Sequence, residues 1–286
     1  MEAPIGAGGD CAAVTQSFDP EAVRAFEHAR WERAAPVFAA SFATATGQFV
    51  DALLDAAGVA AGTRVLDVAC GPGIATADAV ARGAVATGVD FSPAMLAQAR
   101  AATPRVTFLH GDAEALPCAD AAFDAVIANF GVHHVPRPLV ALAEAHRVLA
   151  PDGRIAVSFW AAPEQNVAWK LLLDAVERHG VAATPEAPPP GGGFGSIEQI
   201  LDALRHAGFG ALKAQLERRV WQHADGAGLV AALRAGTARM AARIDALSEA
   251  ALCAAIADID ANAAPWRAAN GLMLPIVAVI ASGTKA

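Results

Sequence analysis

Two glycines follow an apolar run at the point where the chain begins to alternate between strand and helix patterns. Residues 65–68 have the composition of a buried strand, and Gly71 and Gly73 follow shortly after it. A glycine loop at the carboxyl end of a parallel strand lets the backbone approach a ligand closely and turns the next helix toward that ligand. The loop predicts a ligand-binding site. The competing interpretation is a tight turn with a structural role alone.

Residues beside this loop distinguish between classes of ligand. A dinucleotide site would use Gly-x-Gly-x-x-Gly so that a pyrophosphate rests on the helix, but Thr76 stands where the third glycine would be. Asp67, inside the strand, suits a ligand that carries an ammonium and a sulfonium better than one that carries phosphates, either directly or through water. These residues disfavour an NAD-dependent oxidoreductase.

Two more carboxylates follow strand patterns further along the chain. Asp90 follows the run at residues 85–89, and in a doubly wound sheet that position lies beside a cofactor ribose. A carboxylate there accepts hydrogen bonds from the two ribose hydroxyls. A carboxylate that caps a helix is the alternative. Asp112 closes the next run, at residues 106–109, and is placed to accept a hydrogen bond from an adenine amino group.

A pair of histidines follows the fourth strand pattern. The stretch from Asn129 to His134 lies at the sheet edge where open α/β folds place their chemistry. Imidazole titrates near neutrality, so His133 and His134 are the candidate general bases. The alternative is that one histidine packs or hydrogen-bonds within the loop while the other faces solvent.

Three aromatic residues are candidates for contact with a bound substrate. Trp31 lies among the N-terminal helical patterns, and Trp160 ends the fifth strand pattern. Together they are candidates for an apolar wall, and Phe194, in a glycine-rich loop, is a candidate lid tip. Packing in the core or in a cap is the alternative for both tryptophans.

The elements that must position these residues alternate along the chain. Such alternation predicts βαβ units and a parallel sheet covered on both faces. The expected strands are residues 64–69, 85–89, 106–109, 123–128, 154–159, 212–221 and 272–280. The expected helices are two or three within residues 20–57, then 74–82, one that opens at Ser92-Pro93, 139–149, 167–179, 197–206 with a capping box from Ser196 to Gln199, and a helical region at 224–264.

The organisation expected from these patterns is one domain with a tail. Residues 1–19 are expected to form a flexible tail and residues 20–286 the domain, in which N-terminal helices 20–60 and inserted segments 161–210 and 223–266 form a substrate cap. The proline- and glycine-rich stretch 184–195 is expected to be a loop or lid.

Composition excludes several classes of function. The net charge of -8 would repel a phosphate backbone, so nucleic acid is a poor candidate for the substrate. Much of the 55% hydrophobic content is alanine, no apolar run reaches the roughly 20 residues of a membrane span, and residues 1–10 lack the basic region of a secretion signal, so we expect a cytoplasmic protein. The four cysteines are scattered and no oxygen ligands cluster, so no metal site is predicted.

Five motifs, taken in order along the chain, resemble those of the class I S-adenosylmethionine (AdoMet)-dependent methyltransferases. They are VLDVACGPG, GVDFSPAML, GDAEALP, FDAVIANFGVHHV and LAPDGRIAVSFW. The most similar group is that of the ubiquinone/menaquinone-biosynthesis methyltransferases. The resemblance is strong from Trp31 to Trp160 and looser beyond. It implies a doubly wound, Rossmann-like α/β fold with a seven-stranded sheet, mostly parallel with the last strand antiparallel, plus helical cap elements.

The resemblance also implies which residues hold AdoMet. Gly71 and Gly73 would lie against the methionine part, Asp90 on the ribose and Asn129 near the methionine end. Asp112 would lie with Ala113 at the adenine. Further cofactor contacts expected within the same motifs are Asp67, Ala69, Phe91 and Met95.

The implied function is AdoMet-dependent transfer of a methyl group to a small-molecule acceptor by in-line displacement. The acceptor would be a quinone precursor or a secondary metabolite, methylated on oxygen, nitrogen or carbon. Positioning supplies much of the rate of such a reaction, and a base is needed only when the acceptor must lose a proton. The alternative is a regulatory protein that binds AdoMet or another nucleoside without catalysis. The motifs do not indicate the acceptor or the oligomeric state.

Overall fold

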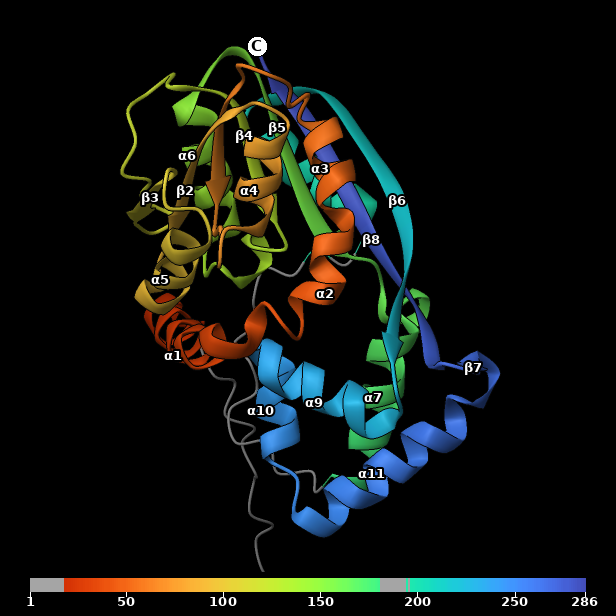
Figure 1. Cartoon of the computed structure of the whole chain (residues 1–286). Helices are drawn as coiled ribbons and strands as arrows, with labels where there is room; N and C mark the ends of the chain where they lie inside the picture. The colour runs from red at the N-terminus through yellow and green to blue at the C-terminus, as the bar shows by residue number, and fades with distance from the viewer. Residues whose placement is uncertain (1–17, 181–193, 195) are drawn as a thin grey trace, which may run out of the picture.

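One mostly parallel β-sheet organises the fold, drawn in Figure 1 from a computed structural model that describes residues 18–180, 194 and 196–286. The strands are β1 (Arg64–Val68), β2 (Val85–Asp90), β3 (Thr107–His110), β4 (Phe123–Asn129), β5 (Leu149–Trp160), β6 (Phe209–His223), β7 (Arg267–Ala268) and β8 (Gly271–Lys285). They run in the order β3-β2-β1-β4-β5-β8-β6, and β7 pairs with β8 outside this order. β8 is antiparallel to both β5 and β6, and the other pairs along the order are parallel.

Helices cover both faces of the sheet. They are α1 (Pro20–Phe38), α2 (Ala43–Thr46), α3 (Val50–Ala56), α4 (Ile74–Ala81), α5 (Pro93–Ala102), α6 (Pro138–Val148), α7 (Val167–His179), α8 (Ile197–His206), α9 (Gly226–Gly236), α10 (Arg239–Asp245) and α11 (Glu249–Asn262). Short 3-10 turns are η1 (Gly47–Phe49), η2 (Val132–His134), η3 (Pro163–Gln165) and η4 (Ala264–Trp266). α3 and α4 pack on one face of the sheet, and α6 and α8 pack on the other.

The sequence of β1 explains why both faces are covered. Val65 packs with α3 and α4, whereas Leu66 and Val68 pack with α6 and α8. Successive side chains of a strand point to opposite faces, so a strand buried on both sides reads as a continuous apolar run. Asp67 interrupts that run, and it points to the α4 side of the sheet, where Thr76 of α4 donates a hydrogen bond to it.

The predicted Rossmann-like fold is confirmed, including the antiparallel last strand. The main order contains the seven predicted strands, and the two-residue β7 makes an eighth. Ser92 and Ser196 cap α5 and α8 as predicted, accepting hydrogen bonds from the backbone N–H of Met95 and of Gln199. The predicted strand ended at residue 280, whereas β8 continues to Lys285. The last residues of β8 are small or polar and carry no apolar pattern, so the prediction missed them, but they still pair with β5 and β6.

A helical cap of α9, α10 and α11 is inserted between β6 and β8. The ends of β6 and β8 pair as a two-stranded ribbon, in which His223 lies opposite Leu272, and the cap follows from this ribbon (Figure 1). Of the two predicted inserted segments, 223–266 supplies α9 to α11, while 161–210 supplies α7, which packs on α11, and α8, which packs on the sheet. The predicted tail and lid lie largely outside the described residues.

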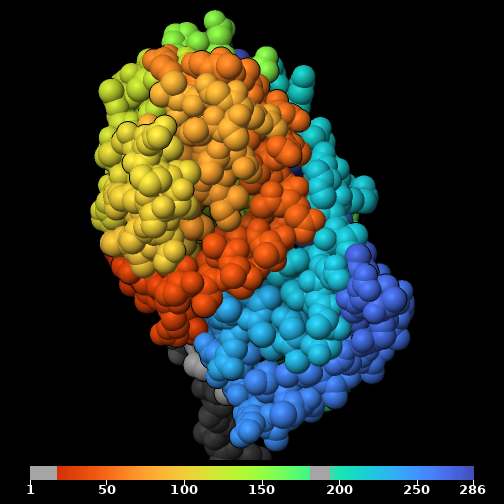
Figure 2. Space-filling model, in the orientation of Figure 1, coloured from red at the N-terminus to blue at the C-terminus, as the bar shows by residue number. Residues whose placement is uncertain are grey.

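α1 lies between the sheet and the cap, as Figure 2 shows from one side. Its N-cap Asp19 accepts hydrogen bonds from Glu21 N and Ala22 N, and Pro20 occupies the first turn, where its missing N–H is not needed. α1 contacts α5 of the sheet region and α9 of the cap. In the described part of the chain no single helix is long and apolar enough to cross a membrane, although the bent pair α1 and Ala43–Ala56 passes on length and composition together.

Gly236 is a point of very close approach between the cap and the N-terminal helices. A Cβ atom there would lie 2.2 Å from Phe42 Cβ and 2.9 Å from Phe42 N. We therefore expect Gly236→Ala to lower the free energy of unfolding by about 1–3 kcal/mol, measured by urea denaturation. The control is Gly210→Ala, whose added Cβ meets no described atom within 4 Å and should leave stability nearly unchanged. Equal stability of the two variants would contradict this packing.

Candidate functional site

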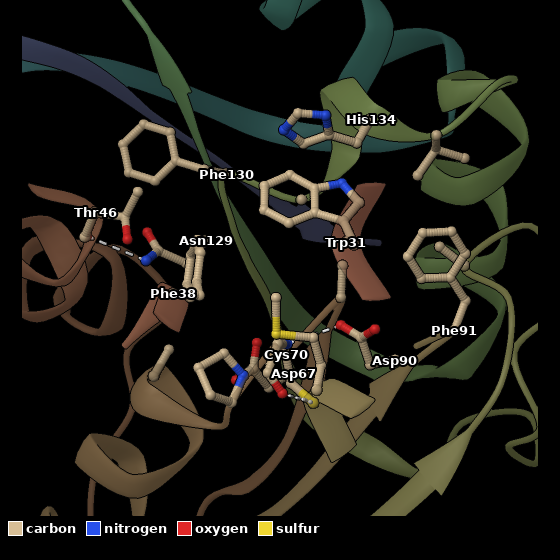
Figure 3. A pocket seen from close by; sticks show the side chains of 18 of the residues that line it. Trp31, Phe38, Thr46, Asp67, Cys70, Asp90, Phe91, Asn129, Phe130 and His134 are labelled. Carbon is tan, nitrogen blue, oxygen red and sulfur yellow. Dashed lines mark hydrogen bonds between the residues drawn. The ribbon is translucent and has the colours of Figure 1, made fainter. Parts of the chain in front are cut away.

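A pocket opens at the carboxyl edge of the sheet beside α1 (Figure 3). The segments that follow β1, β2, β3 and β4 line it together with α1 and the end of β5, and it holds about 1100 Å³ of empty space, open solvent at its mouth included. The strand order reverses next to β1, which is where open α/β sheets bind ligands. Residues predicted from the sequence that line it are Trp31, Asp67, Ala69, Gly71, Asp90, Phe91, Met95, Asp112, Ala113, Asn129, His134 and Trp160.

Asp90 joins the glycine loop to the end of β2. Its Oδ2 accepts a hydrogen bond from Gly71 N at 2.8 Å, and its Oδ1 accepts one from Ser92 N at 2.8 Å. Burial raises the pKa of this carboxyl to about 6, although both backbone N–H groups oppose that rise. A carboxylate offers about four lone-pair positions, so each oxygen keeps acceptor capacity for a ligand hydroxyl.

Asp67 carries an unpaired oxygen at the bottom of the pocket. Thr76 Oγ1 donates to its Oδ2 at 2.6 Å, but Oδ1 is buried and has no hydrogen-bond partner among the described residues. Burial raises the pKa of Asp67 to about 7. A buried polar atom without a partner costs free energy, and such an atom at a pocket wall is a feature of sites completed by a ligand.

Two non-glycine residues at the pocket adopt left-handed backbone conformations. Ala69, after β1, has a φ of 56°, and Phe130, after β4, has a φ of 55°. Gly131 permits this arrangement, because a Cβ there would lie 2.6 Å from Ala69 Cβ. Strained residues of this kind gather at ligand sites, where the surrounding structure holds them in place.

Asn129 braces the pocket wall through both ends of its amide. Its Nδ2 donates to Thr46 O at 3.2 Å, and its Oδ1 accepts from Ser158 Oγ at 2.8 Å. Ser158 Oγ in turn accepts from Phe130 N at 2.8 Å, so this chain of hydrogen bonds fixes the strained turn after β4. Figure 3 shows the part of it that joins Asn129 to Thr46.

Asp112 has a basic partner that the sequence analysis missed. Arg24 of α1 donates from Nε to Asp112 Oδ2 at 2.8 Å, and its Nη2 donates to Glu114 at 2.9 Å. Arg24 also lines the pocket, and its side chain is mostly buried. The seven-residue spacing of Arg24, Trp31 and Phe38, which places all three on one face of a helix, is the signal that would have found it.

Glu27 is a second residue that the sequence analysis missed. It is fully buried in α1, and it accepts hydrogen bonds from His134 Nδ1, Trp31 Nε1 and Arg239 Nε, each at 3.0 Å. Burial raises the pKa of Glu27, but the charges and hydrogen bonds of His134 and Arg239 lower it more, so the net direction is downward. A single acidic residue within a helical pattern gives no sign of such burial.

Aromatic rings form the rest of the wall. The lining aromatic side chains are Trp31, Phe38, Phe42, Phe91, Phe130 and Trp160. The Phe130 and Trp160 rings stack with centroids 4.1 Å apart, and Trp31 meets the His134 ring edge to face at 4.9 Å. This part of the pocket fits a flat or apolar molecule.

Three predicted site residues lie outside the pocket lining. Gly73 precedes α4 with a left-handed φ of 81°, and a Cβ there would lie 3.0 Å from Phe108 of β3, so glycine serves the backbone turn and the packing at this position. His133 is half-buried, its Nδ1 is buried without a hydrogen-bond partner among the described residues, and desolvation lowers its pKa well below the ordinary value. Phe194 packs edge to face on Phe159, 4.8 Å away, on the other face of the sheet.

The pocket therefore has two chemically different halves. Carboxylates and backbone groups of the glycine loop line one half, aromatic rings line the other, and His134 borders the cavity near the rings. A site of this kind is suited to a polar ligand next to an apolar one, and the His134 imidazole is a group of the type that accepts protons. Within residues 18–180, 194 and 196–286, no group of three or more His, Cys, Asp or Glu side chains is placed to hold a metal ion.

Comparison with known sequences identifies the central segment. Residues 66–157 match the family model described as a methyltransferase domain. The demethylmenaquinone methyltransferase of Beutenbergia cavernae is 41% identical over 112 residues, which are 39% of this chain and 47% of that protein. The chain thus spans about half the length of the curated relatives it matches.

Solved structures share the fold over most of the chain. The YcgJ protein of Bacillus subtilis has a TM-score of 0.54 and 20% identity, and the match covers 83% of this chain and 98% of that one. Phosphoethanolamine N-methyltransferase 2 of Haemonchus contortus, solved with phosphomonomethylethanolamine and S-adenosylhomocysteine, has a TM-score of 0.51 and 18% identity over 84% of this chain and 53% of that one. These likenesses show the fold.

The raised pKa of Asp67 makes its charge a cost to folding. The folded state holds the Asp67 proton up to about pH 7, whereas the unfolded chain releases it near pH 3.8, so the free energy of unfolding falls as pH rises between these values. Asp67→Asn cannot ionise. We expect its stability advantage over the wild type to grow by about 1–3 kcal/mol between pH 5 and pH 8, measured by urea denaturation.

The control for this pH dependence is Asp124→Asn. Asp124 is an exposed acid whose pKa the Arg64 guanidinium lowers, so its titration lies below this pH window. Its stability difference from the wild type should stay constant from pH 5 to pH 8. A constant difference for Asp67→Asn as well would show that Asp67 is not the buried titrating group described above.

Proposed function

We propose that this chain, which carries a class I methyltransferase domain, binds AdoMet and transfers its methyl group to a small-molecule acceptor. The observation that carries the proposal is the Asp67, Gly71 and Asp90 constellation on neighbouring parallel strands. Asp90 keeps acceptor capacity for ribose hydroxyls, and the unpaired Asp67 Oδ1 is an acceptor for the cationic methionine end, directly or through water. Gly71 has no Cβ to obstruct the approach of a ligand.

The adenine end of the cofactor belongs beside Asp112 and Ala113. The Arg24 guanidinium holds Asp112 in place, and α1 thereby closes that end of the pocket. Phe91 and Met95 add apolar contacts beside Asp90, the carboxylate proposed to bind the ribose. AdoMet supplies a methyl group that its sulfonium already activates, so the tasks left to the protein are to position the acceptor, exclude water and receive a proton where one is released.

The aromatic half of the pocket is the proposed acceptor site. Trp31 and Trp160 line it, and the chain's net charge of -8 disfavours a nucleic-acid acceptor. A planar acceptor such as a quinone precursor or an aromatic secondary metabolite suits these rings. Trp31 and Phe38 of α1 line this side, and α1 contacts α9 of the cap, which supports a direct role for the N-terminal helices in acceptor binding and an indirect one for residues 223–266.

His134 is the proposed general base. His134 lines the pocket and His133 does not, so His134 is the histidine able to meet an acceptor. A base beside an acceptor pocket favours an enzyme over the alternative of a regulatory protein that binds AdoMet without catalysis.

The cofactor assignment predicts the effect of Asp90→Ala. Loss of the ribose acceptors should weaken AdoMet binding by ~1–3 kcal/mol in isothermal calorimetry. Asp120→Ala is the matched control, because Asp120 is an exposed acid paired with Arg147 away from the pocket, and its affinity should equal that of the wild type. Circular dichroism checks that both variants fold. Unchanged affinity in Asp90→Ala refutes the ribose assignment, and no AdoMet binding by the wild type refutes the proposed function.

The base assignment predicts the effect of His134→Asn. Transfer of a radiolabelled methyl group to a panel of phenols, hydroquinones and amines should fall by about 10²–10⁴-fold for hydroxyl acceptors, with AdoMet affinity retained. Wild-type AdoMet binding without transfer to any acceptor in the panel would favour the non-catalytic alternative. Full activity of His134→Asn would exclude this histidine as the base.

A further inference from the structure

Glu27 is a fully buried carboxylate that lies behind the pocket rather than in it. Its three donors come from three segments: Trp31 of α1, His134 of η2 and Arg239 of α10. Oε2 accepts from both Trp31 and His134, and Oε1 accepts from Arg239. A buried charge is tolerated only when it is paired and hydrogen-bonded, and Glu27 meets both conditions.

The ionised state of Glu27 decides which nitrogen of His134 carries the proton. The pKa of Glu27 lies below its ordinary value, so the side chain is a carboxylate at neutral pH and only accepts hydrogen bonds. Its contact with His134 Nδ1, at 3.0 Å, therefore requires a hydrogen on Nδ1. In a neutral imidazole this leaves Nε2 without a hydrogen, as an acceptor.

The surroundings of His134 hold its ring at the edge of the cavity. Trp31 packs edge to face on one side at 4.9 Å, and the His133 ring lies 4.1 Å away (Figure 3 shows Trp31 and His134). The charged and titratable groups that face His134 are Glu27 of α1, Arg239 of α10 and His133 of η2. Arg239 compensates the charge of Glu27 from the side of Oε1.

We infer that Glu27 is a positioning residue, which fixes His134 in the Nδ1–H tautomer with Nε2 free to accept a proton from the acceptor. This inference rests on the proposed function of His134 as base. Nε2 would take the proton of an acceptor hydroxyl, and the O–H bonding pair would stay on the oxygen to form the bond to the methyl carbon as the bond from that carbon to the sulfonium breaks, its electron pair leaving with the sulfur as a neutral thioether. The Nδ1–H hydrogen bond to Glu27 would stabilise the imidazolium. Because Arg239 belongs to the cap, the arrangement is complete only when α1 and α10 are both docked.

The test compares Glu27→Gln with Glu32→Gln in the full-length chain. Glu32 is also an α1 acid that accepts hydrogen bonds, from Ser92 Oγ and Ala94 N, but it does not contact His134. The first readout is the ¹⁵N chemical shift of the His134 imidazole, which reports its tautomer without needing any turnover. The second is methyl transfer, with kcat and KM determined separately for AdoMet and for a phenol acceptor.

We expect the wild type and Glu32→Gln to show the Nδ1–H tautomer. A glutamine at position 27 is able to donate to Nδ1, which moves the hydrogen to Nε2, so Glu27→Gln should gain the Nε2–H tautomer. Its kcat should fall about 10- to 10³-fold with KM for AdoMet little changed, because a wrong tautomer removes the base without disturbing the cofactor site. Glu27→Asp, which keeps a carboxylate, should retain the Nδ1–H tautomer.

The outcomes separate the two proposals. An Nε2–H tautomer in an active wild-type enzyme overturns the role of Glu27 alone, whether or not any variant folds. The role of Glu27 is also overturned if Glu27→Gln keeps both the Nδ1–H tautomer and the kcat of the wild type. Failure of the wild type to bind AdoMet overturns the proposed function, and the positioning role falls with it even where the tautomer is as expected.

Discussion

The hydrogen bonds between Asp90 and the backbone of the glycine loop hold the polar half of the pocket in shape. They exist because β1 and β2 pair in parallel with Val68 opposite Val89, so the two strands end side by side. Burial opposes the charge on Asp90, and the N–H groups of Gly71 and Ser92 offset part of that cost. The left-handed turns at Ala69 and Phe130 lie at the same edge of the sheet. They turn the chain away from β1 and β4 without filling the pocket.

The apolar half depends on contacts between segments that are distant in sequence. Arg24 ties α1 to the loop after β3, and Glu27 ties α1 to η2 and to α10 of the cap. Arg30 of α1 also pairs with Asp245 at the end of α10. These contacts hold the helix that carries Trp31 at the cavity, so the aromatic half of the pocket is assembled from the N-terminal helices as well as from the sheet, and α10 supports α1 from outside the lining.

The sequence predicted the parts of this structure that follow local rules. Strands with continuous apolar runs and helices with serine N-caps were found close to their true ends, and α7 and α8 match the predicted residues. The resemblance to methyltransferases is confirmed, because residues 66–157 match a methyltransferase domain and the similar curated sequences are methyltransferases. The partners of Glu27 were not predictable, since the burial of one acid depends on the docking of α10, about 210 residues away in sequence. The distinction between His133 and His134 likewise required knowledge of which ring faces the sheet.

The place of β8 in the sheet has a consequence for how the protein is made. β8 lies between β5 and β6 but follows both of them in the chain, so β6 has no partner in the sheet until β8 is synthesised. A ribosome-bound chain that ends within the cap therefore exposes the edge of β5 and a long unpaired β6, which are surfaces prone to aggregation. The cap and the closure of the sheet are thus completed together, after β1 to β4 with their glycine loop and Asp90 have already emerged.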